Sequence, residues 1–348
     1  MRYMSTWRAD APARLPGTAM ARSATVAASR KRPVAAEAIA RLISKHFLIV
    51  AGKGGVGRST VAAALGVAAA RSGRRALVVE TAGRADVPPL LGRSAEDPLT
   101  EDELLPNLHQ VTIDRRGALE EYLRREVPGP IPAAILARSR AFQLFVEAAP
   151  GMSDLLTIGK VWELGQRPRH TPHTHPYDLV ILDAPASGQL VGLLAAPGTF
   201  SRIARVGPTA RQAARIEYAL TDQADIGAVV VATAEQMAVT EAVGLKATLP
   251  ERFGVEVGAV VVNRMLPARF SPEDGLALAA APDDPAICSA RWFHAHAQAQ
   301  RVELERLVGQ LQGASCITLP LLFEAQLGLG HIEQLADLLA GRSHEQPG

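Results

Sequence analysis

Apolar residues occur along the chain in short continuous runs, and longer segments with helical periodicity separate these runs. The runs are rich in Val, Ile and Leu, and they lie at 46–50, 76–80, 109–113, 178–182, 227–231, 258–262 and 317–319. Continuous rather than alternating apolar residues are typical of strands that are covered on both faces, as in a parallel sheet. Helical segments between such strands predict right-handed crossovers. The pattern therefore predicts an α/β fold with a doubly wound, mainly parallel sheet.

Two long segments of the chain lack strand patterns. The first, at about 116–170, has helical periodicity that proline and glycine interrupt, and the second, at about 271–312, is helical throughout. We expect one domain over 46–348 in which these two insertions form a helical cap subdomain. Residues 1–45 are rich in Ala and Arg, and we expect them to form a basic, disordered extension.

The charge of the chain is unevenly distributed. The formal net charge is +2, but residues 1–45 hold nine Lys and Arg against Asp10 and Glu37, so the remainder is slightly acidic. The main body thus gives no reason to expect a nucleic-acid partner. No run of 18 apolar residues occurs, so stable membrane insertion is not expected. The two cysteines, without a CxxC pair, favour a reducing compartment, and we expect a cytoplasmic protein.

A glycine-rich segment follows the first predicted strand and precedes a predicted helix at 59–71. Its candidate nucleotide-binding residues are Gly52, Lys53, Gly54, Gly55, Val56, Gly57, Arg58, Ser59 and Thr60. Glycines allow backbone N–H groups to approach phosphate oxygens closely, and the helix N-terminus favours negative charge. Ser59 supplies a hydroxyl for Mg²⁺. A plain connector is the alternative, but Lys, Ser and Thr in this register favour a phosphate-binding loop.

The order Gly-Lys-Gly-Gly-Val-Gly at 52–57 resembles the deviant Walker A motif of the SIMIBI class, which includes the MinD, ParA, NifH and ArsA branches. In that class the additional lysine, here Lys53, reaches the nucleotide of the partner subunit. Further segments are similar to the ArsA/GET-like, anion-transporting ATPase branch in its bacterial form. These segments are 150–164, the switch II run 183–189, 233–241, the Val-Asn-x-x-Leu-Pro run 262–267, and 319–322.

The resemblance implies specific roles and partners. It implies ATP with Mg²⁺, and a homodimer or a paralogous heterodimer with helical regions that respond to nucleotide state. The implied catalytic residues are Lys53, Arg58 and Asp183, and Ser59 with Asp183 holds the metal. Asn263 would recognise the adenine beside Pro320 and Leu321, because an amide offers both a donor and an acceptor.

Three positions near the expected γ-phosphate depart from the family pattern. Arg58 replaces the second lysine of the loop, Ala82 stands where switch I has an aspartate, and Gln189 replaces a histidine of switch II. An alanine cannot orient the attacking water. Glu80 or Asp86 could substitute, but we expect a solvated or capping role for both. We therefore predict that nucleotide binding is retained and that hydrolysis is slow or depends on a partner.

We interpret the chain as a dimeric ArsA/GET-like ATPase that couples nucleotide state to a client or partner protein. One alternative is a weakly hydrolysing regulatory or structural subunit of a paralogous heterodimer. Another is a MinD/ParA-like positioning ATPase, but residues 332–348 do not form the basic amphipathic helix that binds membranes.

The nature of the client is constrained by side-chain chemistry. Trivalent arsenic requires three thiolates, whereas the chain has only Cys288 and Cys316, which we expect to be buried and structural. No arsenite site is therefore evident. The first insertion could bind a hydrophobic client or pack on itself, through Leu123, Ile131, Ile135, Leu136, Phe142, Leu144 and Phe145. For His170, His173 and His175, we favour a solvated loop over a metal site.

Overall fold

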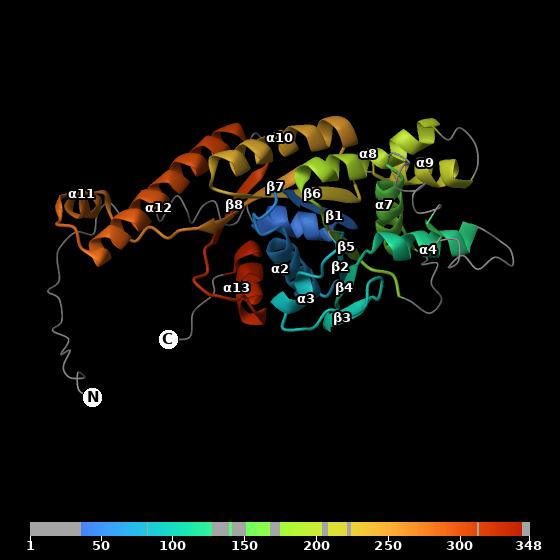
Figure 1. Ribbon diagram of the computed structural model, residues 1–348, viewed down its shortest axis with the longest axis horizontal. Helices are drawn as coiled ribbons and strands as arrows, with labels where there is room; N and C mark the ends of the chain where they lie inside the picture. Colours follow the sequence, from blue (N-terminus) through green and yellow to red (C-terminus); the bar gives the residue numbers. More distant parts are fainter. Residues whose placement is uncertain are drawn as a thin grey trace.

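A single twisted sheet forms the centre of the molecule (Figure 1). The computed structural model describes residues 36–81, 83–126, 139–140, 151–167, 175–203, 208–220, 224–311 and 313–342. The strands are β1 (Phe47–Gly52), β2 (Ala76–Glu80), β3 (Asp102–Leu105), β4 (Leu108–Thr112), β5 (Leu179–Asp183), β6 (Ile226–Thr233), β7 (Val257–Met265) and β8 (Ser315–Pro320). Their order is β3-β4-β2-β5-β1-β6-β7-β8, and only β3 and β4 pair antiparallel. The predicted doubly wound, mainly parallel sheet is confirmed.

Helices cover both faces of this sheet (Figure 1). The helices labelled in Figure 1 are α2 (Arg58–Arg71), α3 (Val87–Leu90), α4 (Arg115–Glu126), α7 (Met152–Leu164), α8 (Ser187–Ile203), α9 (Pro208–Leu220), α10 (Gln236–Phe253), α11 (Pro272–Ala280), α12 (Pro285–Gln310) and α13 (Leu329–Leu339). α2 and α13 pack side by side on one face, and α8 and α10 lie on the other. All residues of β2, β5 and β6 are buried as a result, as the continuous apolar runs predicted.

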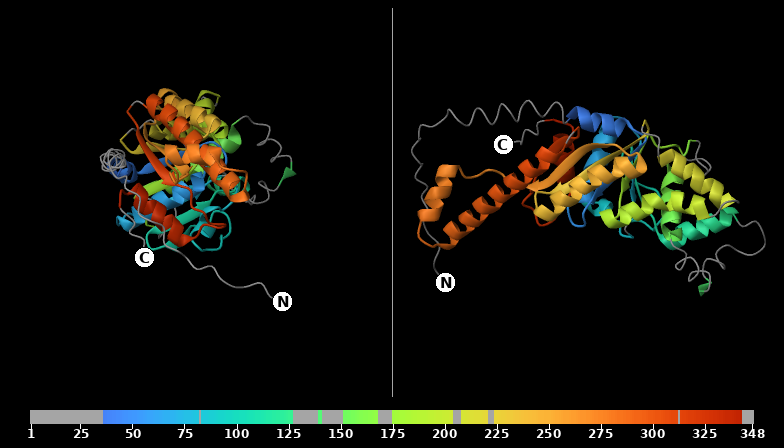
Figure 2. Two further views of the ribbon diagram at one scale, coloured as in Figure 1. Left: turned by 90° about the vertical axis from the view of Figure 1, so that its left-hand side faces the viewer. Right: turned by 90° about the horizontal axis from the view of Figure 1, so that it is seen from above.

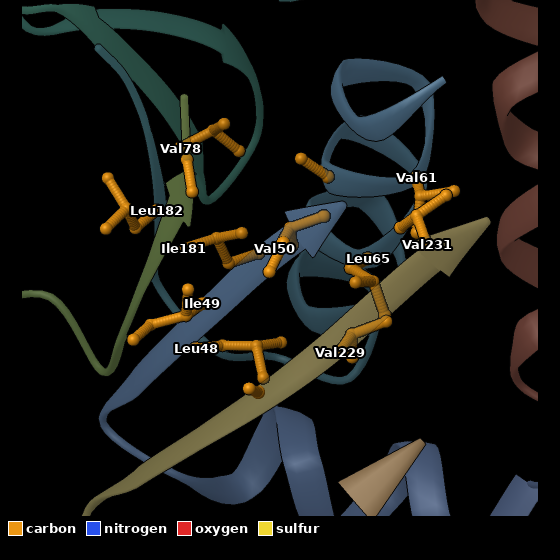
Figure 3. Packing of buried hydrophobic residues seen from close by; sticks show 14 of the residues in the cluster. Leu48, Ile49, Val50, Val61, Leu65, Val78, Ile181, Leu182, Val229 and Val231 are labelled. Carbon is orange, nitrogen blue, oxygen red and sulfur yellow. The ribbon is translucent and has the colours of Figure 1, made fainter. Parts of the chain in front are cut away.

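The core is centred on β1 and α2. Figure 3 shows Val61 and Leu65 of α2 lying over β1 and β6, next to Val229 and Val231. The many alanines of α2 allow the helix to lie close to the sheet, and Gly66 has no room for a side chain because Leu108 and Val78 lie against it. Scarce aromatic residues are thus compensated by close packing of small aliphatic ones.

Two elements were not predicted as the structure has them. β3 forms a short edge hairpin with β4, and its sequence contains Asp102 and Glu103 instead of an apolar run, because one edge of the strand faces solvent. Residues 36–44 are helical, although we assigned them to the disordered extension. Leu42 of this helix is buried against Gly227 and Gly258, so the body begins earlier than expected. Residues 1–35 lie outside the described residues.

The described helices of the two insertions do not form one cap. α4 and α7 of the first insertion lie at one end of the molecule, and α11 and α12 of the second extend from the other (Figures 1 and 2). The physical reason is the strand order, since the first insertion leaves the sheet at β4 and the second at β7, with β2, β5, β1 and β6 between them. Of the predicted groove residues only Leu123 is described, and it packs against Leu119 and Leu156.

The cysteines also differ from expectation. Cys288 is exposed on α12, because that helix extends away from the sheet, and Cys316 on β8 is partly buried. The two are therefore not a pair of buried structural residues. Within the described part of the chain, none of the helices combines the length and the apolar character needed to cross a membrane.

The packing of α2 on the sheet predicts a large stability effect at Leu65. Leu65→Ala should lower the free energy of unfolding by about 2–5 kcal/mol, because it leaves a cavity in a fully buried layer. Leu276→Ala is the matched control, since Leu276 on α11 is 75% exposed, and it should change stability by less than about 0.5 kcal/mol. Urea unfolding followed by circular dichroism measures both, and equal effects would contradict this account of the core.

Candidate functional site

The carboxyl ends of the parallel strands meet at one edge of the sheet, where the glycine-rich loop leaves β1. Strand register aligns Val50 of β1 with Asp183 of β5, and Asp183 with Glu80 of β2. On the other side of β1, Thr233 of β6 pairs with Asn263 of β7. Register alone therefore brings Asp183 and Asn263, which the sequence identified, to the edge that carries the loop.

The backbone of the loop requires glycine at two positions. At Gly52 φ is +157°, and an added Cβ would lie 2.3 Å from the carbonyl oxygen of Val231. At Gly57 φ is +90°, and an added Cβ would lie 2.3 Å from Nδ2 of Asn263. Gly57 is also the N-cap of α2, which begins without a side-chain cap. The first turn of α2 thus presents backbone N–H groups that can bind an anion.

Asp183 and Ser59 place two side-chain oxygen-bearing groups at the base of the loop. The side chain of Asp183 is buried, and the Ser59 hydroxyl lies near enough to its carboxylate to lower the pKa of that group. Burial raises the pKa of Asp183 to about 6, although the bond from Ser59 and the charge of Arg58 lower it. Its Oδ1 is buried without a hydrogen-bond partner among the described residues. A carboxylate in this state favours a cation beside it.

Arg58 faces switch II. Its guanidinium donates a hydrogen bond to the carbonyl oxygen of Ala184, the residue after Asp183. Burial lowers the pKa of Arg58, whereas the carboxylates of Asp183 and Glu241 raise it. Glu241 lies on α10 and was not predicted as a site residue, although it ends the segment 233–241 whose resemblance we noted. No sequence pattern placed it near Arg58.

The side chain of Asn263 is hydrogen-bonded to the glycine-rich loop. Its Nδ2 donates to the carbonyl oxygen of Val56 at 3.0 Å, and its Oδ1 accepts from the backbone N–H of Arg264 at 2.9 Å. The residue is only 4% exposed. Arg264 adds a second link from β7, since its guanidinium donates to the carbonyl oxygen of Gly55 at 3.0 Å. Recognition of adenine by Asn263 therefore stays a prediction, because both polar atoms of its amide already have protein partners.

The late loop predicted beside the base lies next to Asn263. Pro320 at the end of β8 pairs with Met265 of β7, and the backbone N–H of Leu321 donates to the carbonyl oxygen of Met265 at 2.9 Å. Both residues are partly buried. The structure thus brings Pro320 and Leu321 to the same edge as Asn263 and the phosphate loop.

Glu80 organises the segment that follows β2. One carboxylate oxygen accepts from the backbone N–H groups of Asp86 at 2.6 Å and Val87 at 3.1 Å. The other accepts from the side-chain amide of Gln110 at 2.7 Å. This is the capping role that we expected for Glu80. Burial, together with the weaker effect of the nearby charge of Asp183, raises the pKa of Glu80 to about 7, although the hydrogen bonds from Asp86, Val87 and Gln110 lower it.

The remaining predicted residues are more open. Lys53 and Thr60 are partly buried, whereas Gly54 and Gly55 are exposed on the loop and Gln189 is exposed on the first turn of α8. Asp86 forms an exposed ion pair with Arg84, with 3.7 Å between nitrogen and oxygen, and Ala82 lies outside the described residues.

His170 and His173 are also outside the described residues, and His175 is exposed. In the part of the chain that the structure describes, no group of three or more His, Cys, Asp or Glu side chains is arranged to hold a metal ion.

Comparisons with known proteins agree with this geometry. Residues 45–207 match the model of the family described as anion-transporting ATPase. The chain is 32% identical to ATPase BagA of Mycobacterium tuberculosis over 241 residues, which cover 67% of this chain and 69% of that protein. It is 25% identical to protein Rv2184c of the same organism over 337 residues, 85% of this chain and 75% of the relative. The arsenical pump-driving ATPase of Escherichia coli is 24% identical over 255 residues, which cover 67% of this chain and 42% of that protein.

The raised pKa of Glu80 predicts a specific pH dependence of stability. The folded protein binds this proton more tightly than the unfolded chain, so the proton stabilises the fold at low pH. That contribution is lost as the pH rises from the ordinary glutamate range to about 7. Glu80→Gln should therefore remove roughly 1–3 kcal/mol of the fall in unfolding free energy between these limits.

The measurement is urea unfolding at a series of pH values, without nucleotide or divalent cations. Glu273→Gln, an exposed carboxylate on α11, is the control and should leave the profile unchanged. If the profiles of Glu80→Gln and the wild type run parallel, the assignment of the pKa shift to Glu80 is wrong.

Proposed function

Because the chain belongs to the anion-transporting ATPase family and is thereby an ATPase, we propose that it binds Mg²⁺-ATP at residues 52–60 and works as a dimer that couples nucleotide state to a partner or client protein. The observation that most supports this site is the Ser59–Asp183 pair beneath a glycine-rich loop.

Phosphate would be bound by backbone N–H groups of the loop and of the first turn of α2. The left-handed glycines give the loop its curvature, and the uncapped α2 N-terminus adds the positive end of the helix dipole. Lys53 and Arg58 supply cationic side chains, and Thr60 adds a hydroxyl. Together these groups would neutralise the charge of a triphosphate, which water otherwise solvates.

The residues at the base of the loop fit Mg²⁺. This ion prefers oxygen ligands, keeps several waters and is commonly held by one or two protein groups together with substrate phosphates. Ser59 and Asp183 offer a hydroxyl and a carboxylate, and the free Oδ1 of Asp183 is a suitable acceptor for metal-bound water. The ion would supply positive charge that stabilises the phosphoryl group as it is transferred.

The adenine would lie at the edge formed by β7 and β8. Pro320 and Leu321 offer an apolar surface there, next to Asn263. We propose that Asn263 acts by holding the loop through Val56, since its amide is buried and both of its polar atoms already bond to the backbone.

Hydrolysis by the isolated chain is proposed to be slow. Arg58 replaces a compact ammonium with a planar guanidinium, and Gln189 lacks the imidazole of the family motif. Glu80 is an unsuitable replacement for the missing switch I aspartate, because its carboxylate already caps the segment after β2. A partner subunit that brings Lys53 against a second nucleotide would raise the rate.

The dimer would be a homodimer or a paralogous heterodimer in the cytoplasm. The exposed part of the loop at Gly54 and Gly55 leaves Lys53 near the surface, where a second subunit could approach. The name of the Escherichia coli relative links that protein to arsenicals. We propose no arsenite role for this chain, because it has only Cys288 and Cys316, and Cys288 is exposed on α12.

Removal of the metal ligand tests the proposed site. Asp183→Asn should abolish the Mg²⁺ dependence of ATP binding and lower hydrolysis at least about 100-fold, because an amide cannot hold the metal-bound water with a full charge. Asp283→Asn is the control, since this carboxylate is 85% exposed and lies between α11 and α12. Fluorescent-nucleotide titration and phosphate release measure the two quantities. Equal Mg²⁺ dependence in both variants would show that Asp183 is not part of the metal site.

Wild-type turnover in the same assay tests the proposed slow, dimer-dependent hydrolysis. Specific activity should rise with protein concentration if Lys53 acts across a dimer. A rate of about 1–10 s⁻¹ from dilute, monomeric protein would contradict the proposal.

Substitution of Asn263 tests whether its side chain supports the phosphate loop or recognises the adenine base. Asn263→Ala should weaken ATP and GTP binding together, by about tenfold, because it removes a buried hydrogen bond to the loop. A loss confined to ATP would instead show that the amide recognises adenine. Competition titrations with both nucleotides decide between the two roles, and Gln300→Ala is the control because it contacts the same strand at the backbone of Arg264 and Leu266.

A further inference from the structure

The charges of two carboxylates act on Arg58. Its guanidinium donates to the carbonyl oxygen of Ala184, and the carboxylates of Asp183 and Glu241 both act on its charge. Asp183 already has a place in the metal site. Glu241 has none, although a negative charge beside a phosphate-binding loop opposes the binding of an anion.

A hydrogen bond holds Glu241 in this place. The hydroxyl of Ser187, the first residue of α8, donates to Oε1 of Glu241 on α10. Ser187 is buried and belongs to the switch II run 183–189. Arg58, Ala184, Ser187 and Glu241 therefore connect three elements, which are the phosphate loop with α2, switch II with α8, and α10. We refer to these four residues as the Arg58 cluster.

We propose that Glu241 is a positioning residue whose charge competes with the γ-phosphate of ATP for Arg58, so that binding of ATP draws the guanidinium toward the phosphate and away from Ala184 of switch II. This inference rests on the proposed nucleotide site. Before ATP binds, Glu241 and the carbonyl of Ala184 keep the partly buried cation compensated. When the phosphate takes their place, switch II loses its link to the loop and can move with α8.

The chemistry of arginine explains why this position is not a lysine. A guanidinium is a planar group with five N–H donors, so it can donate to a carbonyl and to an anion at the same time. A lysine ammonium is a compact charge without this fork. Arg58 can therefore link the loop to switch II in one state and to phosphate in the other, whereas lysine would serve chiefly the phosphate.

A purely structural role for Glu241 makes a different prediction. If its carboxylate only fixed the N-terminus of α8 through Ser187, its loss would destabilise the fold or weaken all nucleotides alike. Competition for Arg58 instead predicts tighter ATP binding when the carboxylate is removed. The effect should be smaller for ADP, which lacks the γ-phosphate, and it should depend on Arg58.

The experiment is a double-mutant cycle on the full chain with fluorescent ATP and ADP analogues and Mg²⁺. Glu241→Gln should tighten ATP binding about tenfold and ADP binding less than about threefold, because it removes one charged competitor for the guanidinium. In an Arg58→Ala background the same substitution should change ATP binding less than about twofold. Ser187→Ala should act in the same direction as Glu241→Gln but more weakly, since it removes only the hydrogen bond that holds the carboxylate in this place.

Glu251→Gln is the matched control, since this glutamate lies at the exposed end of the same helix and should leave both affinities unchanged. Thermal unfolding of each variant shows whether it is folded, and Ser187→Ala keeps the test decisive if Glu241→Gln is not. Weaker ATP binding in Glu241→Gln, or a gain that is equal for ADP or independent of Arg58, would overturn the proposal. Failure of the wild type to bind Mg²⁺-ATP would instead overturn the proposed function on which it rests.

Discussion

The parallel register of the central strands positions the glycine-rich loop, Asp183 and Asn263 at one edge of the sheet. β2, β5, β1 and β6 run in the same direction, so their carboxyl ends form one edge, and the glycine-rich loop begins there. Burial of apolar side chains on both faces of the sheet keeps these strands aligned. It contributes a free energy of roughly 25 cal/mol for each Å² of apolar surface removed from water. A shift of one residue would move Asp183 away from Ser59 and Val231 away from Gly52.

The charged groups at this edge are held at the boundary between an apolar sheet and solvent. Burial raises the pKa of Glu80 and of Asp183, so each carboxylate is stabilised only where a hydrogen bond or a cation compensates it. Glu80 finds backbone N–H groups, whereas Asp183 keeps an oxygen without a partner among the described residues. This difference separates a carboxylate that supports the structure from one that is suited to a metal ion.

Family membership and local geometry contribute different parts of the functional picture. The comparisons establish that the chain belongs to the anion-transporting ATPase family, and its relatives include chains named for arsenicals as well as ATPase BagA. Arg58 and Gln189 distinguish this chain from the family pattern at the phosphate loop and at switch II. A guanidinium that links the loop to Ala184 is suited to transmit nucleotide state to switch II, even where it is less suited to rapid hydrolysis.

The sequence by itself determined the central strands, the glycine-rich loop and the position of Asp183 at a strand end, because each depends on a local pattern of apolar residues or glycines. It did not reveal the edge hairpin at β3, the helix at 36–44 or the separation of the two insertions, since these depend on strand order and on contacts between distant segments.

The tertiary structure alone decided the partners of the side chains. Asn263 holds Val56 across 207 positions of sequence, and Glu241 reaches Ser187 across 54. No pattern along the chain encodes such pairs, because they arise only when α10 and β7 pack beside the loop. Folding therefore converts a recognisable phosphate-binding sequence into a site whose cation is already engaged by switch II.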